Sequence, residues 1–349
     1  MEIKPGSIFL DYEVLEEIGR GGFGAVFKGK KIHSEPPFFV AIKVLHQIHA
    51  GHEKNVRRFH REARLARKLS HPNVVAILDD GVIEDIHYII MEFAEGKNLL
   101  LWMIEGDSET SVYESNTLSM TRSDLAEPSA SNQDIQDAQT VVLDKAFVPG
   151  TFPAGSAETA IPLMKQCADV LKSAEEAGLV HRDIKPENIL VRKSQDGTLQ
   201  VKILDFGLAK NFVDESVQLS SAGQAIGTPA YMSPEQFKGD SLDIRSDLYS
   251  LGATFYTFVT GQKPFKGPGL REFMHQVIME NPMPASQANP SVSENFSRIL
   301  LRLMHKDPSK RYQHPNELLQ DLNRSASVQD TAKQKTWGWT GLKSIFQKE

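Results

Sequence analysis

The sequence lacks the features that mark secreted, membrane-spanning and nucleic-acid-binding proteins. A single cysteine, Cys167, excludes an intrachain disulfide, which fits a reducing cytosol. No apolar stretch approaches the roughly 20 residues that a membrane-spanning helix needs. The N-terminal residues have no basic start and apolar core of a signal peptide. The net charge of -6 leaves no basic excess for binding nucleic acid. We therefore expect a cytoplasmic globular protein with no transmembrane segment.

Residues 12–45 alternate between apolar and polar side chains and predict three strands joined by turns. A glycine cluster of Gly19, Gly21, Gly22 and Gly24 lies between the first two strands. Glycines at this spacing let backbone N–H groups approach phosphates, because no Cβ atom intervenes. Strand sequence follows the cluster where a Rossmann dinucleotide site would have a helix. The cluster therefore predicts a two-stranded flap folded over phosphates.

Lys43 lies near the end of the third predicted strand, and a predicted helix follows at residues 54–69. Glu62 lies on the apolar face of that helix, where a carboxylate is costly unless it is paired. Lys43 is its natural partner, and the pair would orient the lysine toward nucleotide phosphates. Two more predicted strands, residues 74–82 and 85–93, lead into a glycine-bearing linker. Small-molecule sites favour such a junction between two halves of a chain.

The composition changes at residue 106 and again after residue 325. Residues 106–158 form an insertion rich in Ser, Thr, Asp and Glu, with no sustained periodicity. The insertion fits a solvated, disordered loop, or else an acidic tether that is phosphorylated and docks a partner. The tail, residues 326–349, carries Trp337 and Trp339 among apolar residues and lysines. It fits either a mobile or packed tail or a short helix that docks on a membrane surface or a partner.

A long helix is predicted to lead from the insertion to residue 178. Thr159 is the expected cap, Pro162 falls in the expected first turn, and Gly178 ends the helix. Cys167 lies on the apolar face of this helix, so we expect a buried packing thiol rather than a reactive one.

Residues 181–207 carry the densest chemistry in the chain. Asp183, Lys185 and Asn188 lie on one short loop, and Asp205 lies on a second. Strand-like sequence separates the loops, at residues 189–192 and 199–204. Two carboxylates, an amide and an ammonium can hold a hydroxyl nucleophile and one or two Mg²⁺ ions against a polyphosphate.

Residues 10–105 and 159–312 resemble a eukaryotic-type protein kinase domain and are most similar to bacterial Ser/Thr protein kinases. The resemblance rests on eight elements in order: GRGGFGAV, VAIK, Glu62, HRDIKPEN, DFG, GTPAYMSPE, DIRSDLYSLG and DPSKRY. It implies an α+β, bilobal protein kinase fold. The N-terminal lobe, residues 1–94, would be a small antiparallel sheet with one main helix. A hinge and first helix (95–105) would lead, beyond the insertion, to a larger and mostly helical C-terminal lobe at residues 159–325.

The family's functional residues match positions of this chain one by one. Asp183 resembles the catalytic base, with Lys185 and Asn188 beside it, and Asn188 and Asp205 resemble the Mg²⁺ ligands. Lys43 would contact the α- and β-phosphates of ATP, and Glu62 would hold Lys43. The remaining expected ATP contacts are Ile18, Gly19, Gly21, Gly22, Gly24, Val26, Ala41, the gatekeeper Met91, the hinge residues Glu92 and Ala94, and Leu190. ATP with Mg²⁺, or Mn²⁺ in its place, is the implied cofactor.

The resemblance also implies the substrate class and a route of activation. Lys185 and Thr228 match the pattern of Ser/Thr kinases rather than tyrosine kinases. Arg182, directly before Asp183, implies a cation that a phosphate on the activation segment would balance. We therefore expect autophosphorylation at Ser220 or Ser221. Ser216 is a third serine in that segment.

Three further residues are expected to organise the site. Glu235 should pair with Arg311 in a buried contact, and Asp247 should bind the backbone of the catalytic loop. Neither contact takes part in the chemistry.

The leading hypothesis is a Ser/Thr protein kinase that uses Mg-ATP, acts on protein Ser/Thr hydroxyls and forms a homodimer for autophosphorylation in trans. A pseudokinase or scaffold that works through the insertion and the tail is the alternative. The complete set of Lys43, Asp183, Asn188 and Asp205 argues against that alternative. A small-molecule phosphotransferase is a third reading, which the GTPAYMSPE sequence disfavours.

Overall fold

The computed structural model describes residues 3–21, 24–105, 155–206, 229–267 and 269–325. The chain forms two compact units, and each is described by itself. The first comprises Met1–Pro153 with Pro186–Ala209, and the second comprises Ala154–Lys185 with Lys210–Glu349. The predicted lobe boundaries remain predictions.

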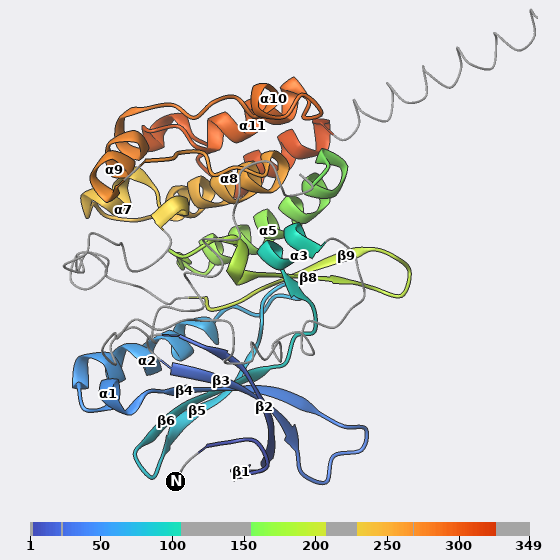
Figure 1. Cartoon of the computed structure of the whole chain (residues 1–349), viewed down its shortest axis with the longest axis vertical. Coiled ribbons are helices and arrows are strands. Elements are labelled where there is room, and N and C mark those ends of the chain that lie inside the picture. The colour runs from blue at the N-terminus through green and yellow to red at the C-terminus, as the bar shows by residue number, and fades with distance from the viewer. Residues whose placement is uncertain (1–2, 22–23, 106–154, 207–228, 268, 326–349) are drawn as a thin grey trace, which may run out of the picture. The chain divides into compact units, whose positions relative to one another are not determined.

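A six-stranded antiparallel sheet forms the body of the first unit (Figure 1). Its spatial order is β1-β2-β3-β4-β6-β5. All the strands predicted between residues 12 and 93 are present, at boundaries close to those expected from the alternation. The strands are β1 (Ile8–Phe9), β2 (Tyr12–Arg20), β3 (Gly24–Lys31), β4 (Phe39–Leu45), β5 (Ile77–Ile83) and β6 (Ile86–Glu92).

Alternation along these strands gives the sheet two apolar faces. Phe9, Phe27 and Ile42 pack on one face under the N-terminal segment. The helix α2 (Glu53–Ala66) covers the other face through Phe59 and Ala63, after the single turn of α1 (Gln47–Ala50). Because successive side chains point to opposite faces, Ala41 and Lys43 lie on the side that α2 covers.

A second, three-stranded sheet completes the first unit. It consists of β7 (Lys97–Asn98), β8 (Ile189–Lys193) and β9 (Leu199–Ile203), in that order. The helix α3 (Leu99–Glu105) follows β7, and a 3₁₀ turn (Pro186–Asn188) leads into β8. The amide of Val75 donates to the Ile203 carbonyl at 3.0 Å, and the amide of Ile203 donates to the Asn73 carbonyl at 2.8 Å. These bonds tie β9 to the segment that enters β5.

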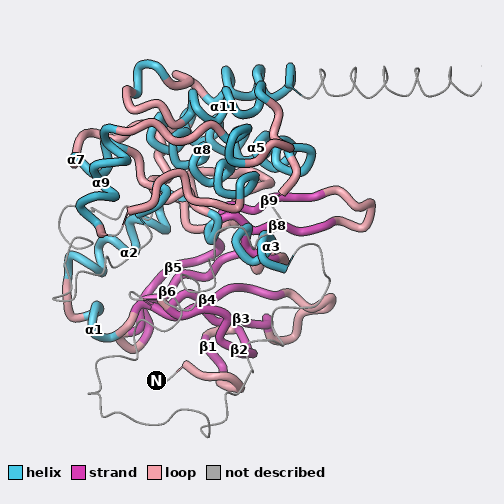
Figure 2. The backbone as a smooth tube through the Cα atoms, turned by 45° about the horizontal axis from the view of Figure 1, so that its top comes forward, coloured by secondary structure: helices cyan, strands magenta, loops and turns pink. Residues whose placement is uncertain are grey.

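The second unit is helical, and α8 (Ile244–Thr260) is its centre. Figure 1 shows α8 between α5 (Ala157–Glu176) and α11 (Glu294–Leu303), Figure 2 shows α8 alongside α5, and α8 packs on both. Nearly every residue of α8 is buried, as expected for a helix with neighbours on all sides. Shorter elements surround it: a 3₁₀ turn (Pro229–Tyr231), α7 (Pro234–Lys238), α9 (Leu270–Met279), α10 (Ala285–Ala288) and a second 3₁₀ turn (Pro308–Lys310), followed by helical residues 315–325.

The start of α5 differs from the prediction. Ser156, not Thr159, is the cap: its Oγ accepts a hydrogen bond from the Thr159 amide at 3.2 Å. The helix therefore begins at Ala157, and Pro162 lies beyond the first turn. The sequence offers two hydroxyl residues three positions apart, and both can cap. The end of the helix agrees with the prediction, because Gly178 has a φ of 66° and its amide donates to Glu175 O at 2.9 Å.

Two further expectations concern the single cysteine and membrane-spanning helices. Cys167 is completely buried, and burial raises the pKa of its thiol, which confirms a packing role. Among the helices that the structure describes, none is both long enough and apolar enough to cross a lipid bilayer.

Candidate active site

The predicted phosphate flap is the hairpin between β2 and β3. Gly21 and Gly24 exchange backbone hydrogen bonds of 2.9 and 3.3 Å across its tip. A Cβ atom on Gly24 would lie 2.1 Å from the Val44 carbonyl oxygen, so the close approach of β3 to β4 requires glycine there. A Cβ atom on Gly19 or Gly21 would have no protein atom within 4 Å. Packing thus explains Gly24 but leaves Gly19 and Gly21 without a structural requirement.

Most of the predicted adenine contacts belong to one apolar cluster in the first unit. Ala41 and Met91 are buried in it, and Ile18, Val26 and Ala94 are partly buried against it. The strand register explains this gathering, because Val26 pairs with Lys43 and Ala41 pairs with Met91 across adjacent strands. Leu190 is not part of this cluster. It lies on β8 in the second sheet, opposite Lys202.

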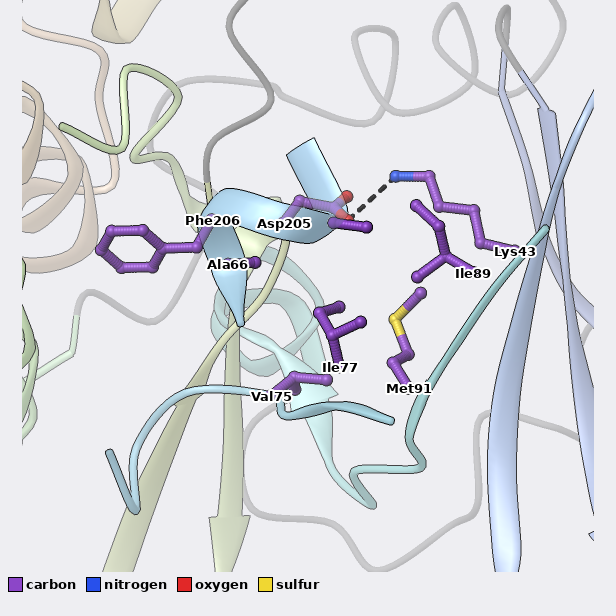
Figure 3. A pocket seen from close by; sticks show the side chains of 9 residues that line it. Lys43, Ala66, Val75, Ile77, Ile89, Met91, Asp205 and Phe206 are labelled. Carbon is purple, nitrogen blue, oxygen red and sulfur yellow. Dashed lines mark hydrogen bonds and ion pairs between the residues drawn. The ribbon is translucent and has the colours of Figure 1, made fainter. Parts of the chain in front are cut away.

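Lys43 forms an ion pair with Asp205 across 162 positions of sequence. The lysine Nζ donates to Asp205 Oδ1 at 2.9 Å; the lysine side chain is largely buried and the aspartate side chain is partly buried. Figure 3 shows the two side chains reaching toward one another, while the ring of Phe206 points away from Lys43. The predicted pairing of Lys43 with Glu62 stays a prediction, because the Glu62 side chain lies outside the described part of the chain.

A small cavity lies beside this ion pair. Ala63 and Ala66 from α2 line it together with Ile77, Ile89 and Met91 (Figure 3). Its volume is about 20 Å³, which suits about one water molecule. The α2 helix is therefore one wall of the space at which Lys43 and Asp205 meet.

The pairing of β8 with β9 brings Asn188 close to Asp205. Ile189 pairs with Ile203, and the Leu204 amide donates to the Asn188 carbonyl at 2.9 Å. Asp205 follows directly and has a φ of 54°, a left-handed conformation uncommon for a residue with a side chain. An amide oxygen and a carboxylate are the hard ligands that Mg²⁺ prefers, and Mg²⁺ commonly takes few protein ligands besides phosphate oxygens. The donor set therefore fits the implied cation.

Lys202 is a residue that the sequence analysis missed. Its Nζ donates to both carboxylate oxygens of Glu92 at 2.7 Å, and both residues belong to the first unit. The sequence predicts Glu92 only as a hinge residue that contacts ATP. The alternation of β9 could have indicated on which face of the sheet Lys202 lies, but only the folded chain identifies Glu92 as its partner.

In the second unit, Asp247 organises the loop that carries Asp183. Its two carboxylate oxygens accept the amides of His181 and Arg182 at 2.6 and 2.7 Å, which confirms the predicted contact. The Asp183 amide donates to His181 Nδ1 at 3.2 Å. Burial raises the pKa of Asp247, against the charge of His181 and the two amide bonds.

Asp183 and Lys185 contact each other within this loop. Lys185 Nζ lies 3.0 Å from Asp183 Oδ2, and both side chains are largely buried. Arg182 has a φ of 68°, and its carbonyl accepts a 2.8 Å bond from Gln236 Nε2. The loop is thus held from α8 by Asp247 and from α7 by Gln236.

The predicted ion pair of Glu235 with Arg311 is present. The guanidinium donates two bonds of 2.6 and 2.8 Å to the carboxylate, and Ser246 adds a third at 2.7 Å. Burial opposes ionisation of Glu235, but the bonds and charge of Arg311 outweigh it, so the pKa of Glu235 is lowered.

Comparison with known proteins supports the resemblance seen in the sequence. A family model described as protein tyrosine and serine/threonine kinase matches residues 12–322. The chain belongs to this protein kinase family. The match spans both units and every motif on which the resemblance rested.

The curated relatives compared with this kinase-family chain are proteins of bacteria. The chain is 35% identical over 331 residues to serine/threonine-protein kinase pkn2 of Myxococcus xanthus, covering 93% of the chain and 34% of the relative. It is 31% identical over 322 residues to serine/threonine-protein kinase PknB of Mycobacterium leprae, covering 91% of the chain and 43% of the relative. The chain thus spans roughly a third to a half of the length of such relatives.

Solved structures confirm the fold. The PknI kinase domain of Mycobacterium tuberculosis, as a double mutant, aligns with a TM-score of 0.60 at 22% identity, over 93% of this chain and all of that one. Rad53 in complex with AMP-PNP aligns with a TM-score of 0.61 at 21% identity, over 88% of this chain and 64% of that one. The curled antiparallel sheet and the helical unit are those of the bilobal kinase fold.

Several predicted residues lie outside the part of the chain that the structure describes. They are Gly22, the activation-segment residues Ser216, Ser220, Ser221 and Thr228, the Glu62 side chain, residues 106–154 of the insertion, and the tail.

Proposed function

We propose that this chain is a Ser/Thr protein kinase that transfers the γ-phosphoryl group of Mg-ATP to hydroxyl groups of protein substrates. The observation that carries the proposal is the ion pair of Lys43 with Asp205. It joins a phosphate-binding cation to a metal-binding carboxylate, at the end of the apolar cluster that holds Val26 and Ala41. Lys43 lies on β4 and Asp205 follows β9, so the pair joins residues from the two sheets.

The first unit would bind the nucleotide. Gly19 and Gly21 leave open space for close approach of phosphates, and the cluster around Ala41 offers an apolar surface to adenine. Lys43 would contact the α- and β-phosphates, and Asn188 and Asp205 would hold Mg²⁺. The bound cation supplies charge neutralisation on the phosphates and orients them.

The second unit would supply the acceptor side of the reaction. Asp183 would accept the proton of the substrate hydroxyl as its oxygen bonds to the γ-phosphorus, and ADP would leave. Lys185, 3.0 Å from Asp183, would stabilise charge that develops nearby. Most of the rate enhancement in such a reaction comes from positioning and charge stabilisation.

The acceptor class and activation are proposed from the same loop. Lys185 in HRDIKPEN and the names of the bacterial relatives support serine or threonine acceptors. Arg182 supports activation by autophosphorylation at Ser220 or Ser221, in trans between two copies. A cytoplasmic location is proposed from the single cysteine and the apolar content of the sequence.

Replacement of Asp183 tests the proposal. The Asp183→Asn protein should lose phosphate transfer to a generic Ser/Thr substrate by about 10²–10⁴-fold, because an amide accepts no proton. The measurement is incorporation of labelled phosphate from Mg-ATP, with nucleotide affinity measured in parallel. Affinity should change little, since nucleotide binding is proposed for other residues, Lys43 and Asp205 among them.

Transfer by the unmutated protein is the decisive control. Absence of transfer after treatment with an active kinase that phosphorylates the activation segment would favour the pseudokinase or scaffold. Equal transfer by both proteins would assign the activity to a contaminant.

A further inference from the structure

Three side chains join α2 to the sheet through a continuous chain of hydrogen bonds. His60, on α2, bonds through Nδ1 to Asp80 Oδ2 at 2.9 Å. Its other nitrogen, Nε2, lies 3.0 Å from His87 Nδ1. Asp80 is on β5 and His87 is on β6, so one imidazole contacts two neighbouring strands. We refer to Asp80, His60 and His87 as the histidine relay.

The same carboxylate holds α2 at a second point. Asp80 Oδ1 lies 3.1 Å from Arg67, which caps the end of α2 seven residues after His60. That spacing is about two helical turns, so both contacts lie on one face of the helix. The His60 and Asp80 side chains are largely buried, at 16% and 13% exposure. Bonds of this kind are stronger than surface pairs because water competes less for them.

The position of α2 matters for the candidate active site. Ala63, one turn after His60, lines the cavity at the Lys43–Asp205 pair, and Ala66 lines it one turn later. A shift of α2 would therefore move the wall of that cavity. The relay holds α2 to the sheet one turn before this wall.

We propose that His60 is a positioning residue of the candidate active site, and that protonation of both His60 and His87 breaks the bond that joins α2 to β6. The proposal rests on the proposed kinase function for its effect on nucleotide binding, but not for the relay itself.

The proton count explains why the relay responds to pH. Asp80 accepts the Nδ1–H of His60, so the contact between His60 Nε2 and His87 Nδ1 can contain only one proton. When each imidazole is an imidazolium, both of these nitrogens carry a hydrogen. Two donors then face each other at 3.0 Å, and the bond is lost.

The pKa of His87 sets the direction of the response. Burial lowers it, and the charge of His60 lowers it further, against the opposing effect of Asp85. A lowered pKa in the folded state means that the unfolded chain binds more protons. The contact of His87 therefore contributes fully above the ordinary histidine value of about 6.5. Its contribution is lost as pH falls through the lowered folded value.

Other charged and titratable groups lie on the elements that pack around the relay. They are Arg64 and Arg67 on α2, Asp79 and Asp80 on β5, Glu84 and Asp85 in the following turn, Tyr88 on β6, and His49 on α1.

The test compares the full chain with its His87→Asn variant. Asparagine presents a polar atom near the position of Nδ1 but does not titrate. Affinity for Mg-ADP is measured by calorimetry from about pH 8 down to about pH 5.5. The unmutated chain should lose roughly two- to tenfold in affinity, the equivalent of one hydrogen bond. His87→Asn should stay within about twofold, and titration of the nucleotide itself affects both proteins equally.

Hydrogen exchange supplies a readout that needs no nucleotide. After correction for intrinsic rates, the amides of α2 should exchange faster at low pH in the unmutated chain but not in His87→Asn. Asp80→Asn should show fast exchange at every pH. Identical pH profiles for the unmutated chain and His87→Asn would overturn the relay. Normal pH-dependent exchange without any Mg-ADP binding would instead retain the relay and overturn the proposed kinase function.

Discussion

The buried pair of Glu235 and Arg311 shows how one residue can hold distant parts of the second unit together. Arg311 is among the largest fully buried side chains, and each of its three guanidinium nitrogens donates hydrogen bonds. Besides Glu235, it donates to the carbonyls of Arg245, His305 and Lys306. These carbonyls come from α8 and from the segment after α11. The guanidinium therefore fixes α7, α8 and that segment at a single point.

Removal of Arg311 should destabilise the protein strongly. Arg311→Met leaves the Glu235 carboxylate buried without its cation, which costs about 3–5 kcal/mol. The double variant Glu235→Leu with Arg311→Met should be less destabilised than Arg311→Met alone, because no lone charge remains. Denaturant unfolding of the three proteins measures both differences. A double variant less stable than Arg311→Met would show that packing, not charge, dominates at this point.

The same pair gives an expected pH dependence. The pKa of Glu235 is lowered in the folded state, so its contribution is complete above the ordinary value of about 4.5 and is lost as pH falls through the folded value. Arg311→Met should show a weaker dependence in that window.

At the scale of elements, a residue at the start of α5 and a residue inside it have opposite effects on the stability of the helix. Ser156 satisfies an amide that the helix itself leaves unpaired. The helical hydrogen bonds begin with the Ala160 amide, which donates to the Ser156 carbonyl at 2.9 Å. Pro162 interrupts them, because it has no N–H to donate to the Glu158 carbonyl. The proline is solvent-exposed, so it adds little packing in return.

Substitutions in α5 should therefore change stability in opposite directions. Ser156→Ala should cost about 1 kcal/mol through loss of the cap. Pro162→Ala should gain about 1–3 kcal/mol, because it restores a helical hydrogen bond. Thr159→Ala is the matched control and should have a smaller effect than Ser156→Ala. Thermal unfolding measures all three, and a larger loss for Thr159→Ala would assign the cap to the residue that the sequence suggested.

At the scale of the whole molecule, the first unit combines chain segments that are far apart in sequence. Its two sheets are joined by the backbone bonds between residues 73–75 and β9, by the Glu92–Lys202 pair and by the Lys43–Asp205 pair. Two of these contacts involve residues expected to meet the nucleotide. Binding of a nucleotide should accordingly stabilise the fold.

Mg-ADP should raise the unfolding temperature of the intact chain. At a concentration 100 times its dissociation constant, a ligand that binds only the folded state adds about 2.7 kcal/mol. Removal of Mg²⁺ with a chelator, or Lys43→Met, should reduce the shift, because each removes positive charge from the phosphates. Scanning fluorimetry checks the prediction. An equal shift with and without Mg²⁺ would contradict the metal-binding role of Asn188 and Asp205.

The sequence by itself determined the elements of this protein and its membership of the kinase family. Alternation predicted β2, β3, β4 and β6, and helical periodicity predicted α2, because these patterns depend on neighbours only a few residues away. The motif residues Lys43, Asp183, Asn188 and Asp205 were identified in the same way, since their type and order are written in the chain. Their roles remain proposals for experiment.

Only the tertiary structure decided which side chains meet. Asp205 as the observed partner of Lys43, Lys202 beside Glu92, and the contact of His60 with both Asp80 and His87 all join positions far apart in sequence. No local periodicity encodes such pairs, because they depend on strand register and on the packing of α2 against the sheet. The glycines show the same division, because their spacing is visible in the sequence. Only the fold shows that the Val44 carbonyl leaves no room for a Cβ atom on Gly24, while a Cβ atom on Gly19 or Gly21 would meet no protein atom.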